Sequence, residues 1–360
     1  MSIQRSTLPH RRALSRREFL KLSGVTAAGL FLARCAPAAT PTAVAPTAAG
    51  IQANLSTIHL GYDNPQWSHQ VADYVAREKG WFADVGLSEV DLIIFDDSLV
   101  AVIGGGVNMT AGDTDAILQA HLDQDVDVWW LGTRRDKEDV LFGLAPGVTI
   151  ESLRGSGASV SGGLVGSRNE YLGKQMLKEL GLDPEKDVTW ITLGGGSDTR
   201  LAALINGELA GTNIQVRHIT QLEEAGGTVA YNKRRHIAQE GYIAMGPYIQ
   251  ANGDTVLAFL TAIIKAKQYV KDLSHKDEVI EIMKKNGFEF PQEFIDTYAD
   301  GIEILSADCG FEIAEMELLW GELAAVGEAP ADFPWRDGLN LEFLWKAQEA
   351  NGLPRRPASL

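Results

Sequence analysis

The sequence is poor in cysteine and lacks the short motifs of the common catalytic sites. Its two cysteines are Cys35 and Cys309. If Cys35 carries a lipid, Cys309 has no partner within the chain, which excludes a disulfide framework. It contains neither a Gly-x-Ser-x-Gly nucleophile elbow nor a Gly-x-x-x-x-Gly-Lys-Ser/Thr phosphate loop. Its seven histidines are dispersed, without the spacing of a zinc site. We therefore expect a protein that is not an enzyme and needs no metal or cofactor, with Cys309 a small buried residue rather than a nucleophile.

A long apolar run is also missing. The run from Leu22 to Ala33 is shorter than the roughly 20 residues that a helix needs to span a bilayer. It follows Arg16-Arg17, and the stretch from Ser15 to Lys21 resembles the twin-arginine export signal. The segment predicts export; a mobile basic arm followed by a buried helix is the alternative.

The export segment ends at a candidate lipid-attachment site. Leu32-Ala33-Arg34-Cys35 resembles the lipobox of bacterial lipoproteins, although Arg34 stands where a small residue is usual. The residues that follow are almost all Ala, Pro and Thr, a composition that cannot bury enough surface to order itself. We predict a signal and lipobox over residues 1–35, a disordered tether over residues 36–55, and a protein anchored through Cys35 outside the cytoplasm, on the outer face of the cytoplasmic membrane or in the periplasm. Cleavage within residues 36–38, giving a soluble secreted protein, is the alternative.

Basic residues are scarce in the remainder. The net charge of the chain is −16, and removal of residues 1–35 leaves 25 basic against 47 acidic residues, or −22. Such a surface repels phosphate backbones, so nucleic acid is not an expected partner. The remainder is large for one hydrophobic core and suits two lobes.

Short apolar strands alternate with helices along the folded part. The pattern predicts strands over residues 57–62, 90–95, 108–111, 126–131, 158–161 and 188–193, and helices over residues 69–79, 114–122, 167–180 and 199–206. From Gly253 onward apolar residues recur at helical spacing and strands nearly vanish. Alternation of this kind predicts an α/β fold with parallel-rich sheets, followed by a helical C-terminal part.

Several segments of this part resemble one family. They are Tyr74–Phe82, Gly181–Trp190, Gly194–Leu209 and Thr255–Tyr269, which read YVAREKGWF, GLDPEKDVTW, GGGSDTRLAALINGEL and TVLAFLTAIIKAKQY. Their order and spacing resemble the substrate-binding proteins of ABC importers, in the NMT1/THI5-like group that handles nitrate, sulfonates, taurine and thiamine precursors. The chain departs from the pattern at Ala210, where an aspartate is frequent.

The resemblance implies a type II periplasmic-binding-protein fold. It implies two Rossmann-like lobes joined by a two-stranded hinge, with crossovers near residues 140–144 and 242–245 and C-terminal helices wrapping lobe one. Lobe one would comprise residues 56–139 and 244–360, and lobe two residues 140–243. The resemblance also implies a monomer that binds a small molecule between its lobes and passes it to ABC permease subunits.

Ligands of parallel sheets lie beyond the carboxyl ends of the strands, where four loops carry candidate binding residues. The first holds Tyr62, Asn64, Trp67 and His69. Tyr62 and Trp67 could sandwich a flat ring, although Trp67 could equally cover the edge of the core. The loop resembles one in the thiamine-precursor branch that carries a nearby Asn and His, so His69 is a candidate ligand contact, with a helix cap or a surface histidine as alternatives. We expect a partly aromatic or heterocyclic ligand rather than nitrate or a bare sulfonate.

The other three loops offer polar groups near helix N-termini, which favour negative charge. The candidate residues are Thr110, Gly112, Asp113 and Thr114 in the second loop, Gly163, Ser167 and Arg168 in the third, and Gly195, Ser197, Asn213 and Gln215 around the fourth. Helix capping would also explain Asp113, Thr114 and Ser167, and Arg168 could be solvated.

Two other functions share the expected fold. Pyrimidine synthases of thiamine biosynthesis resemble it, so the fold alone does not exclude catalysis, although an export signal argues against their intracellular chemistry. An exported sensor that docks to a receptor is the third hypothesis.

Overall fold

The computed structural model describes residues 50–63, 66–95 and 97–360. The predicted signal, Cys35, residues 36–49 of the predicted tether and Asn64 lie outside the described residues. Among those described, no helix is both long enough and apolar enough to cross a membrane.

The described strands form one sheet of mixed direction, in the order β2-β1-β3-β8-β4-β7-β5-β6. β1 pairs in parallel with β2 and β3, and β5 pairs in parallel with β6 and β7, while β4 and β8 are antiparallel to each other and to the strands that flank them. The strands are β1 Thr57–Tyr62, β2 Glu89–Ile94, β3 Met109–Asp113, β4 Val128–Leu144, β5 Ala158–Ser161, β6 Val188–Trp190, β7 Gly211–Ile214 and β8 Thr228–Met245. The chain therefore has the α/β fold that its alternating pattern predicted.

Helices connect the strands and form most of the C-terminal part. They are α1 Trp67–Glu78, α2 Trp81–Asp84, α3 Ser98–Ile103, α4 Thr114–Leu122, α5 Ile150–Leu153, α6 Arg168–Glu179, α7 Gly196–Ile205, α8 Ile219–Glu224, α9 Gly246–Lys271, α10 Lys276–Lys285, α11 Gln292–Asp296, α12 Tyr298–Glu303, α13 Ile313–Val326 and α14 Glu342–Ala350. In α9 the residues at helical spacing, among them Val256, Phe259 and Ile263, are completely buried, because this helix packs against α1, α14 and β8.

The buried apolar residues form one large cluster and two smaller ones. The large cluster joins strands β1 to β3 and the adjoining ends of β4 and β8 to helices α1 to α4 and to the C-terminal helices from α9 onward. The smaller two lie around β5, β6, β7 and helices α6 to α8. We call the part around the large cluster lobe one and the part around the smaller clusters lobe two. The domain boundaries predicted above stay a prediction.

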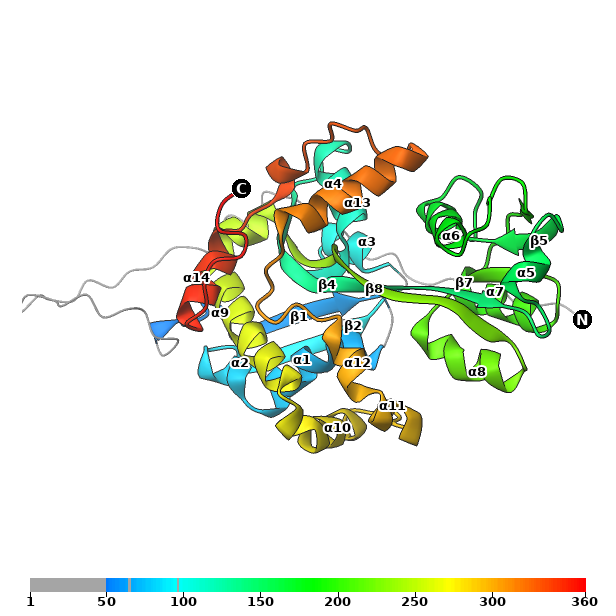
Figure 1. The fold of residues 1–360 in the computed structure, drawn as a ribbon. Coiled ribbons are helices and arrows are strands. Elements are labelled where there is room, and N and C mark those ends of the chain that lie inside the picture. Colours follow the sequence, from blue (N-terminus) through cyan, green and yellow to red (C-terminus); the bar gives the residue numbers. More distant parts are fainter. Residues whose placement is uncertain (1–49, 64–65, 96) are drawn as a thin grey trace, which may run out of the picture. The chain divides into compact units, whose positions relative to one another are not determined.

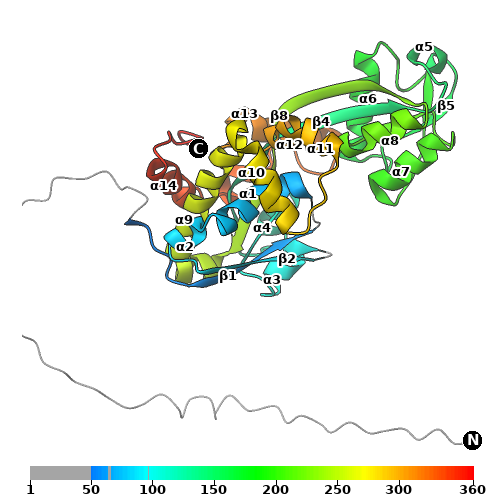
Figure 2. The same ribbon diagram turned by 90° about the horizontal axis from the view of Figure 1, so that it is seen from below.

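β4 and β8 run from lobe one into lobe two as one long antiparallel pair (Figures 1 and 2). The pairing extends from Val128 opposite Met245 to Leu144 opposite Thr228, with several register shifts. The strand predicted over residues 126–131 is thus much longer than its apolar part. Opposite charges face each other in the middle of the pair: Glu138 is opposite Arg235 and Asp139 is opposite Arg234. Cross-strand ion pairs therefore continue the strands through a stretch without apolar alternation.

Two more boundaries differ from the prediction. The strand predicted over residues 188–193 ends at Trp190, and α7 begins at Gly196, inside the predicted loop. The cause is the glycine sequence: Gly195 is the N-cap with a left-handed backbone, φ 86°, a conformation that glycine adopts without strain.

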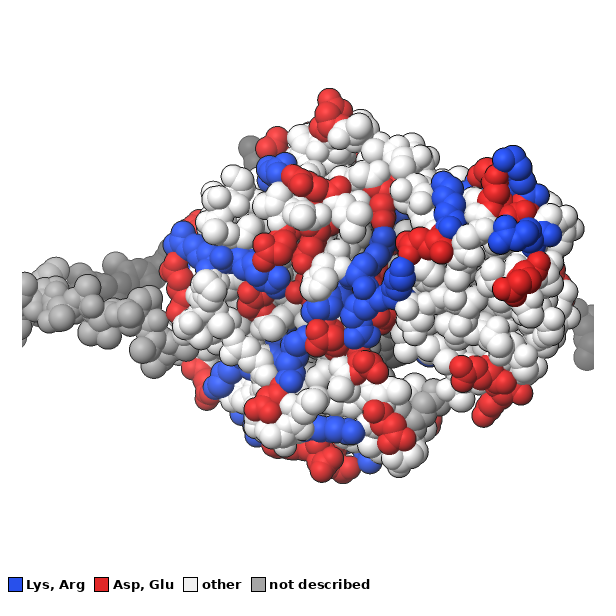
Figure 3. Space-filling model, in the orientation of Figure 1, with Lys and Arg blue, Asp and Glu red and all other residues white. Residues whose placement is uncertain are grey.

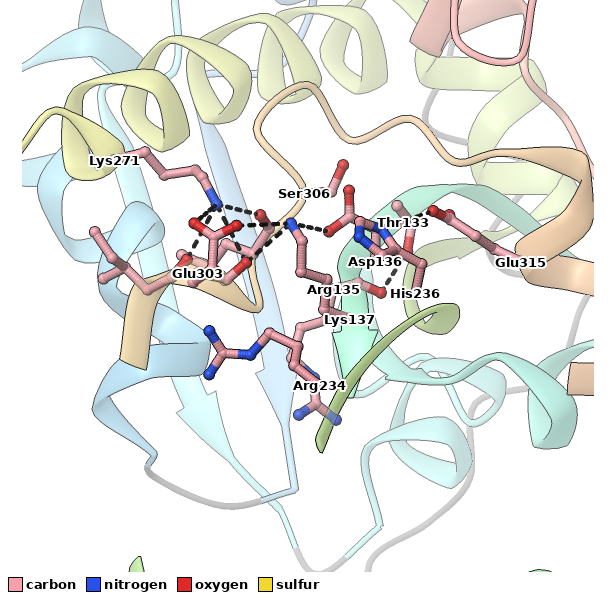
Figure 4. Close-up of polar contacts among 12 residues, drawn as sticks. Thr133, Arg135, Asp136, Lys137, Arg234, His236, Lys271, Glu303, Ser306 and Glu315 are labelled. Carbon is pink, nitrogen blue, oxygen red and sulfur yellow. Dashed lines mark hydrogen bonds and ion pairs between the residues drawn. The ribbon is translucent and has the colours of Figure 1, made fainter. Parts of the chain in front are cut away.

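The end of α12 and the residues that follow it contact the long strand pair (Figure 4). The Glu303 carboxylate accepts from Lys137 of β4 at 3.2 Å and from Lys271 of α9 at 3.3 Å. Next to it, the Ser306 backbone N–H donates to the Arg134 carbonyl at 3.2 Å. The helical C-terminal part therefore contacts the strand pair as well as the core of lobe one.

Candidate functional site

A cavity of about 960 Å³ lies beside the middle of β4 and β8. Its walls come from the start of α1, from both long strands, from α6, α7 and β7 of lobe two, and from the segment spanning residues 286–304. A cavity lined by both lobes next to the strands that connect them is suited to hold a small molecule.

One wall of the cavity is aromatic and belongs to lobe one. Trp67 and Tyr74 of α1 and Phe288 and Phe294 of the facing segment line it. Trp67 stacks on Tyr298 with ring centroids 5.7 Å apart and contacts Phe290 at 5.0 Å, so the ring both covers the core edge and faces the cavity. This wall offers ring edges and faces to an apolar ligand group.

Tyr62 does not take part in this wall. It ends β1 pointing into lobe one, where its side chain is 1% exposed and lies near the Arg134 guanidinium, 5.4 Å from the ring centroid. Burial, with Asp73 adding to it, raises the pKa of Tyr62 well above its ordinary value. The predicted sandwich of a ligand ring between Tyr62 and Trp67 is therefore wrong in this structure, because the strand directs Tyr62 into the core.

His69 belongs to a buried ionic cluster at the base of the cavity. Arg134 approaches the ring Nδ1 at 3.3 Å and Arg135 approaches Nε2 at 3.1 Å. Both arginines also donate to Glu240. Burial and then Arg135 lower the pKa of His69 well below its ordinary value, so the ring is neutral near pH 7. His69 is neither a helix cap nor a surface residue, and its contact with a ligand stays a prediction.

The second loop places one of its candidate side chains in the cavity. Thr110 is buried and donates to the Gly61 carbonyl at 2.8 Å, and Thr114 is buried and accepts from Trp130 Nε1 at 3.2 Å. Gly112 is half-buried and does not line the cavity. Asp113 does line it and makes no capping bond to α4, so capping does not explain its carboxylate.

The Asp113 carboxylate has an unusual protonation equilibrium. It keeps solvent contact through the open cavity, but the protein atoms crowded around it and the nearby Glu240 raise its pKa to about 7. Asp113 can therefore donate or accept a hydrogen bond near neutral pH.

The third and fourth loops contribute less than expected. Ser167 caps α6 by accepting from the Glu170 N–H. Gly163, Gly195 and Ser197 do not line the cavity, whereas Asn213 and Gln215 do.

Arg168 lines the cavity but is not solvated. It forms two hydrogen bonds with Glu138, at 2.8 and 3.2 Å, and one with Glu322 at 3.0 Å. Burial opposes the ionisation of Glu138, yet Arg168 and Arg235 lower its pKa to about 2. A ligand would have to compete with two carboxylates for Arg168.

The prediction missed the charged residues of the long strands and one helical arginine. These cavity-lining residues are Arg135, Glu138, Asp139, Glu240 and Arg200. For Arg135, Glu138 and Asp139 the sequence does carry a signal, the charge run Arg134–Asp139 between apolar strand residues. On the face shown in Figure 3, basic and acidic side chains gather next to one another over the region of β4 and β8.

Two other kinds of site have no support within the described residues. No group of three or more His, Cys, Asp or Glu side chains there is placed to hold a metal ion. Cys309 is completely buried, as expected, and burial raises the pKa of its thiol to about 11, which suppresses the nucleophilic thiolate.

Comparison with known proteins identifies the family. The family model described as NMT1/THI5 like matches residues 67–275, more than half of the chain. The chain belongs to this family. Its match to the proposed binding protein YtlA of Bacillus subtilis (strain 168) has 24% identity over 306 residues and covers 76% of this chain and 84% of YtlA.

Solved structures of other proteins share the fold. The periplasmic nitrate-binding protein NrtA from Synechocystis PCC 6803 has a TM-score of 0.62 at 16% identity, covering 85% of this chain and 93% of NrtA. The periplasmic aliphatic sulphonate binding protein SsuA from Escherichia coli has a TM-score of 0.59 at 16% identity, covering 80% of this chain and 92% of SsuA. The fold of this NMT1/THI5-like protein is thus that of periplasmic binding proteins.

Proposed function

We propose that this chain is the solute-binding protein of an ABC importer, which captures a small organic molecule and passes it to permease subunits. The observation that carries the proposal is the cavity of about 960 Å³ lined by both lobes beside the two strands that connect them. A paired two-strand connection allows the lobes to close on a ligand by bending, as in hinge closure. Family membership and the binding roles that YtlA, NrtA and SsuA are named for support the same role.

The ligand we propose is organic and partly aromatic or heterocyclic, as expected from the sequence. The support now comes from Trp67, Tyr74, Phe288 and Phe294, rather than from a ring pair that includes Tyr62. A small inorganic anion would leave this wall without a contact. We propose that the protein binds this ligand without transforming it, because its cavity-lining histidine is held between two arginines and its cysteine is buried.

Closure of the lobes gives the test of this function. A thermal-shift screen of pyrimidines, flavins, aromatic acids, sulfonates and nitrate identifies a ligand, because a compound that binds the folded state raises the melting temperature. Small-angle scattering with that ligand in excess should then give a smaller radius of gyration than the free protein. A compound from the same screen that causes no thermal shift is the control. An unchanged radius of gyration at saturation would contradict capture by closure.

Export and anchoring complete the proposal. We propose a monomer held at the outer face of the cytoplasmic membrane through Cys35. Changing Cys35 to Ser should move the protein from the membrane fraction to the soluble fraction, which fractionation and immunoblotting measure. If the unchanged protein is already soluble, Arg34 has prevented acylation and the anchoring proposal is wrong.

A further inference from the structure

Arg200 is a buried cation whose side chain lacks a hydrogen-bond or ion-pair partner in the part of the chain that the structure describes. It lies on α7 of lobe two, lines the cavity and is 8% exposed. Within the described residues its side chain forms no hydrogen bond or ion pair, and its Nε is completely enclosed without a partner. Burial lowers the pKa of Arg200 from its ordinary value, although the Asp198 carboxylate, which is paired with Arg217, opposes this shift; an arginine remains charged at neutral pH. The fold therefore holds a positive charge without a directly bonded partner at the cavity wall.

The other arginines of the cavity wall differ from Arg200 in this respect. Arg135 is paired with Glu240, Arg168 with Glu138 and Glu322, and Arg217 with Asp198. Buried charges in proteins are normally paired, because desolvation without a counter-charge is costly. A buried arginine without a partner in the protein is therefore expected at a site where the ligand supplies the negative charge.

The backbone beside Arg200 leaves room for its guanidinium. A Cβ at Gly163 would lie 3.2 Å from Arg200 Nη1, and Gly163 has a positive φ of 107°. A side chain at this position would press on the guanidinium and strain the backbone. Gly163 thus contributes space for Arg200 rather than a contact with the cavity.

We propose that Arg200 binds the anionic group of the ligand and that the ligand is an aromatic carboxylate. The inference rests on the proposed function. One guanidinium without a directly bonded partner matches one negative charge, which favours a monoanion over a phosphate dianion. The planar fork of arginine matches a planar carboxylate with two parallel hydrogen bonds. The ring of the same molecule packs on the wall formed by Trp67, Tyr74, Phe288 and Phe294, so one ligand contacts both lobes.

Arg200 then selects between ligands of the same shape. Benzoate and benzamide differ in charge but hardly in size, and the rings of both can make the same contacts with the aromatic wall. Benzoate should raise the melting temperature of the wild-type protein and benzamide should not. Arg200→Met should weaken benzoate binding about ten- to hundredfold, as expected for loss of hydrogen bonds to a charged group. Arg154→Met is the matched control, because Arg154 is an exposed arginine of lobe two that does not line the cavity.

A second measurement needs no ligand. Removing a buried charge without a directly bonded partner should raise the melting temperature of the free protein, by about 2 °C for a relief of roughly 1 kcal/mol. The same change at the paired Arg168 should lower it. Isothermal titration and thermal unfolding give both readouts.

The possible results separate this inference from the proposed function. Equal binding of benzoate and benzamide, or benzoate binding that survives Arg200→Met, overturns the role of Arg200 while capture of a small molecule stands. A free Arg200→Met protein destabilised as much as Arg168→Met also overturns it. If no aromatic acid binds, the proposed ligand class is wrong, and the proposed function fails only if the wider screen and the scattering test fail as well.

Discussion

Glu240→Gln should be among the most destabilising single substitutions in the protein. The Glu240 side chain is 9% exposed and accepts from Arg134 and Arg135, whose side chains are 6% and 13% exposed. Glutamine keeps the size but removes the charge, which leaves two buried guanidiniums without the carboxylate that pairs with both. Breaking a buried pair in this way costs about 3–5 kcal/mol, equivalent to a fall of roughly 5–10 °C in melting temperature. Chemical denaturation and calorimetry measure the loss.

Glu342→Gln provides the matched control. Glu342 pairs with Lys346 one helical turn away, and its side chain is 65% exposed. Such pairs contribute about 0.3–0.5 kcal/mol, so the same substitution should have little effect there. If both substitutions lowered the free energy of unfolding equally, the buried cluster would contribute no more to stability than an exposed ion pair.

The effect of Glu240→Gln should also depend on pH. Burial opposes ionisation of Glu240, but Arg134 and Arg135 hold its pKa well below the ordinary value of 4.5. A carboxylate with a lowered pKa contributes stability above its unfolded-state pKa and loses that contribution as pH falls towards its folded-state pKa. The difference in free energy of unfolding between the wild type and the variant should therefore be largest near pH 7. It should shrink as the pH falls below about 4.5.

The fold follows from local patterns that survive in the structure. Thr57–Tyr62 is a strand with the predicted bounds, and Arg168–Glu179 is a helix that begins where Ser167 caps it. Apolar periodicity locates these elements because each buries one face on a lobe core. The family segments add the order of the elements, which periodicity does not determine.

The long strand pair could not be predicted in this way. Its middle carries Glu138, Asp139, Arg234 and Arg235, which resemble a solvated loop when each strand is considered alone. They are strand residues because each charge has its partner directly across the pair. Pairing between residues about 100 positions apart leaves no periodic signal in a single sequence.

The candidate site was also predicted incompletely, because it too depends on contacts between residues that are distant in the sequence. The first loop suggested Tyr62 and Trp67 as a pair, but the direction of a side chain at a strand end depends on the register of β1 in the sheet. Arg200 lies in a helix that is otherwise largely apolar, and from the sequence alone a single arginine there is expected to be exposed. Its burial and lack of a partner exist only in the packed structure.

The ionic network around Arg168 should show strong coupling in a double-mutant cycle. Arg168 of α6 and Arg235 of β8 both contact Glu138 of β4 and Glu322 of α13, so two arginines face two carboxylates. Arg168→Met leaves one arginine with two carboxylates, and Glu322→Gln leaves one carboxylate with two arginines. Each single change should cost about 3–5 kcal/mol.

The double variant restores the balance of charge. With Arg168→Met and Glu322→Gln combined, Glu138 and Arg235 remain as a matched cross-strand pair. The total loss should then be smaller than the sum of the single losses by about 2 kcal/mol, within the range of measured couplings between residues in contact. Urea denaturation of the four proteins measures this difference, and strictly additive losses would contradict a shared network.

Because Arg168 also joins α6 of lobe two to α13, the free double variant should have a larger radius of gyration than the free wild type, while Glu342→Gln should leave that radius unchanged.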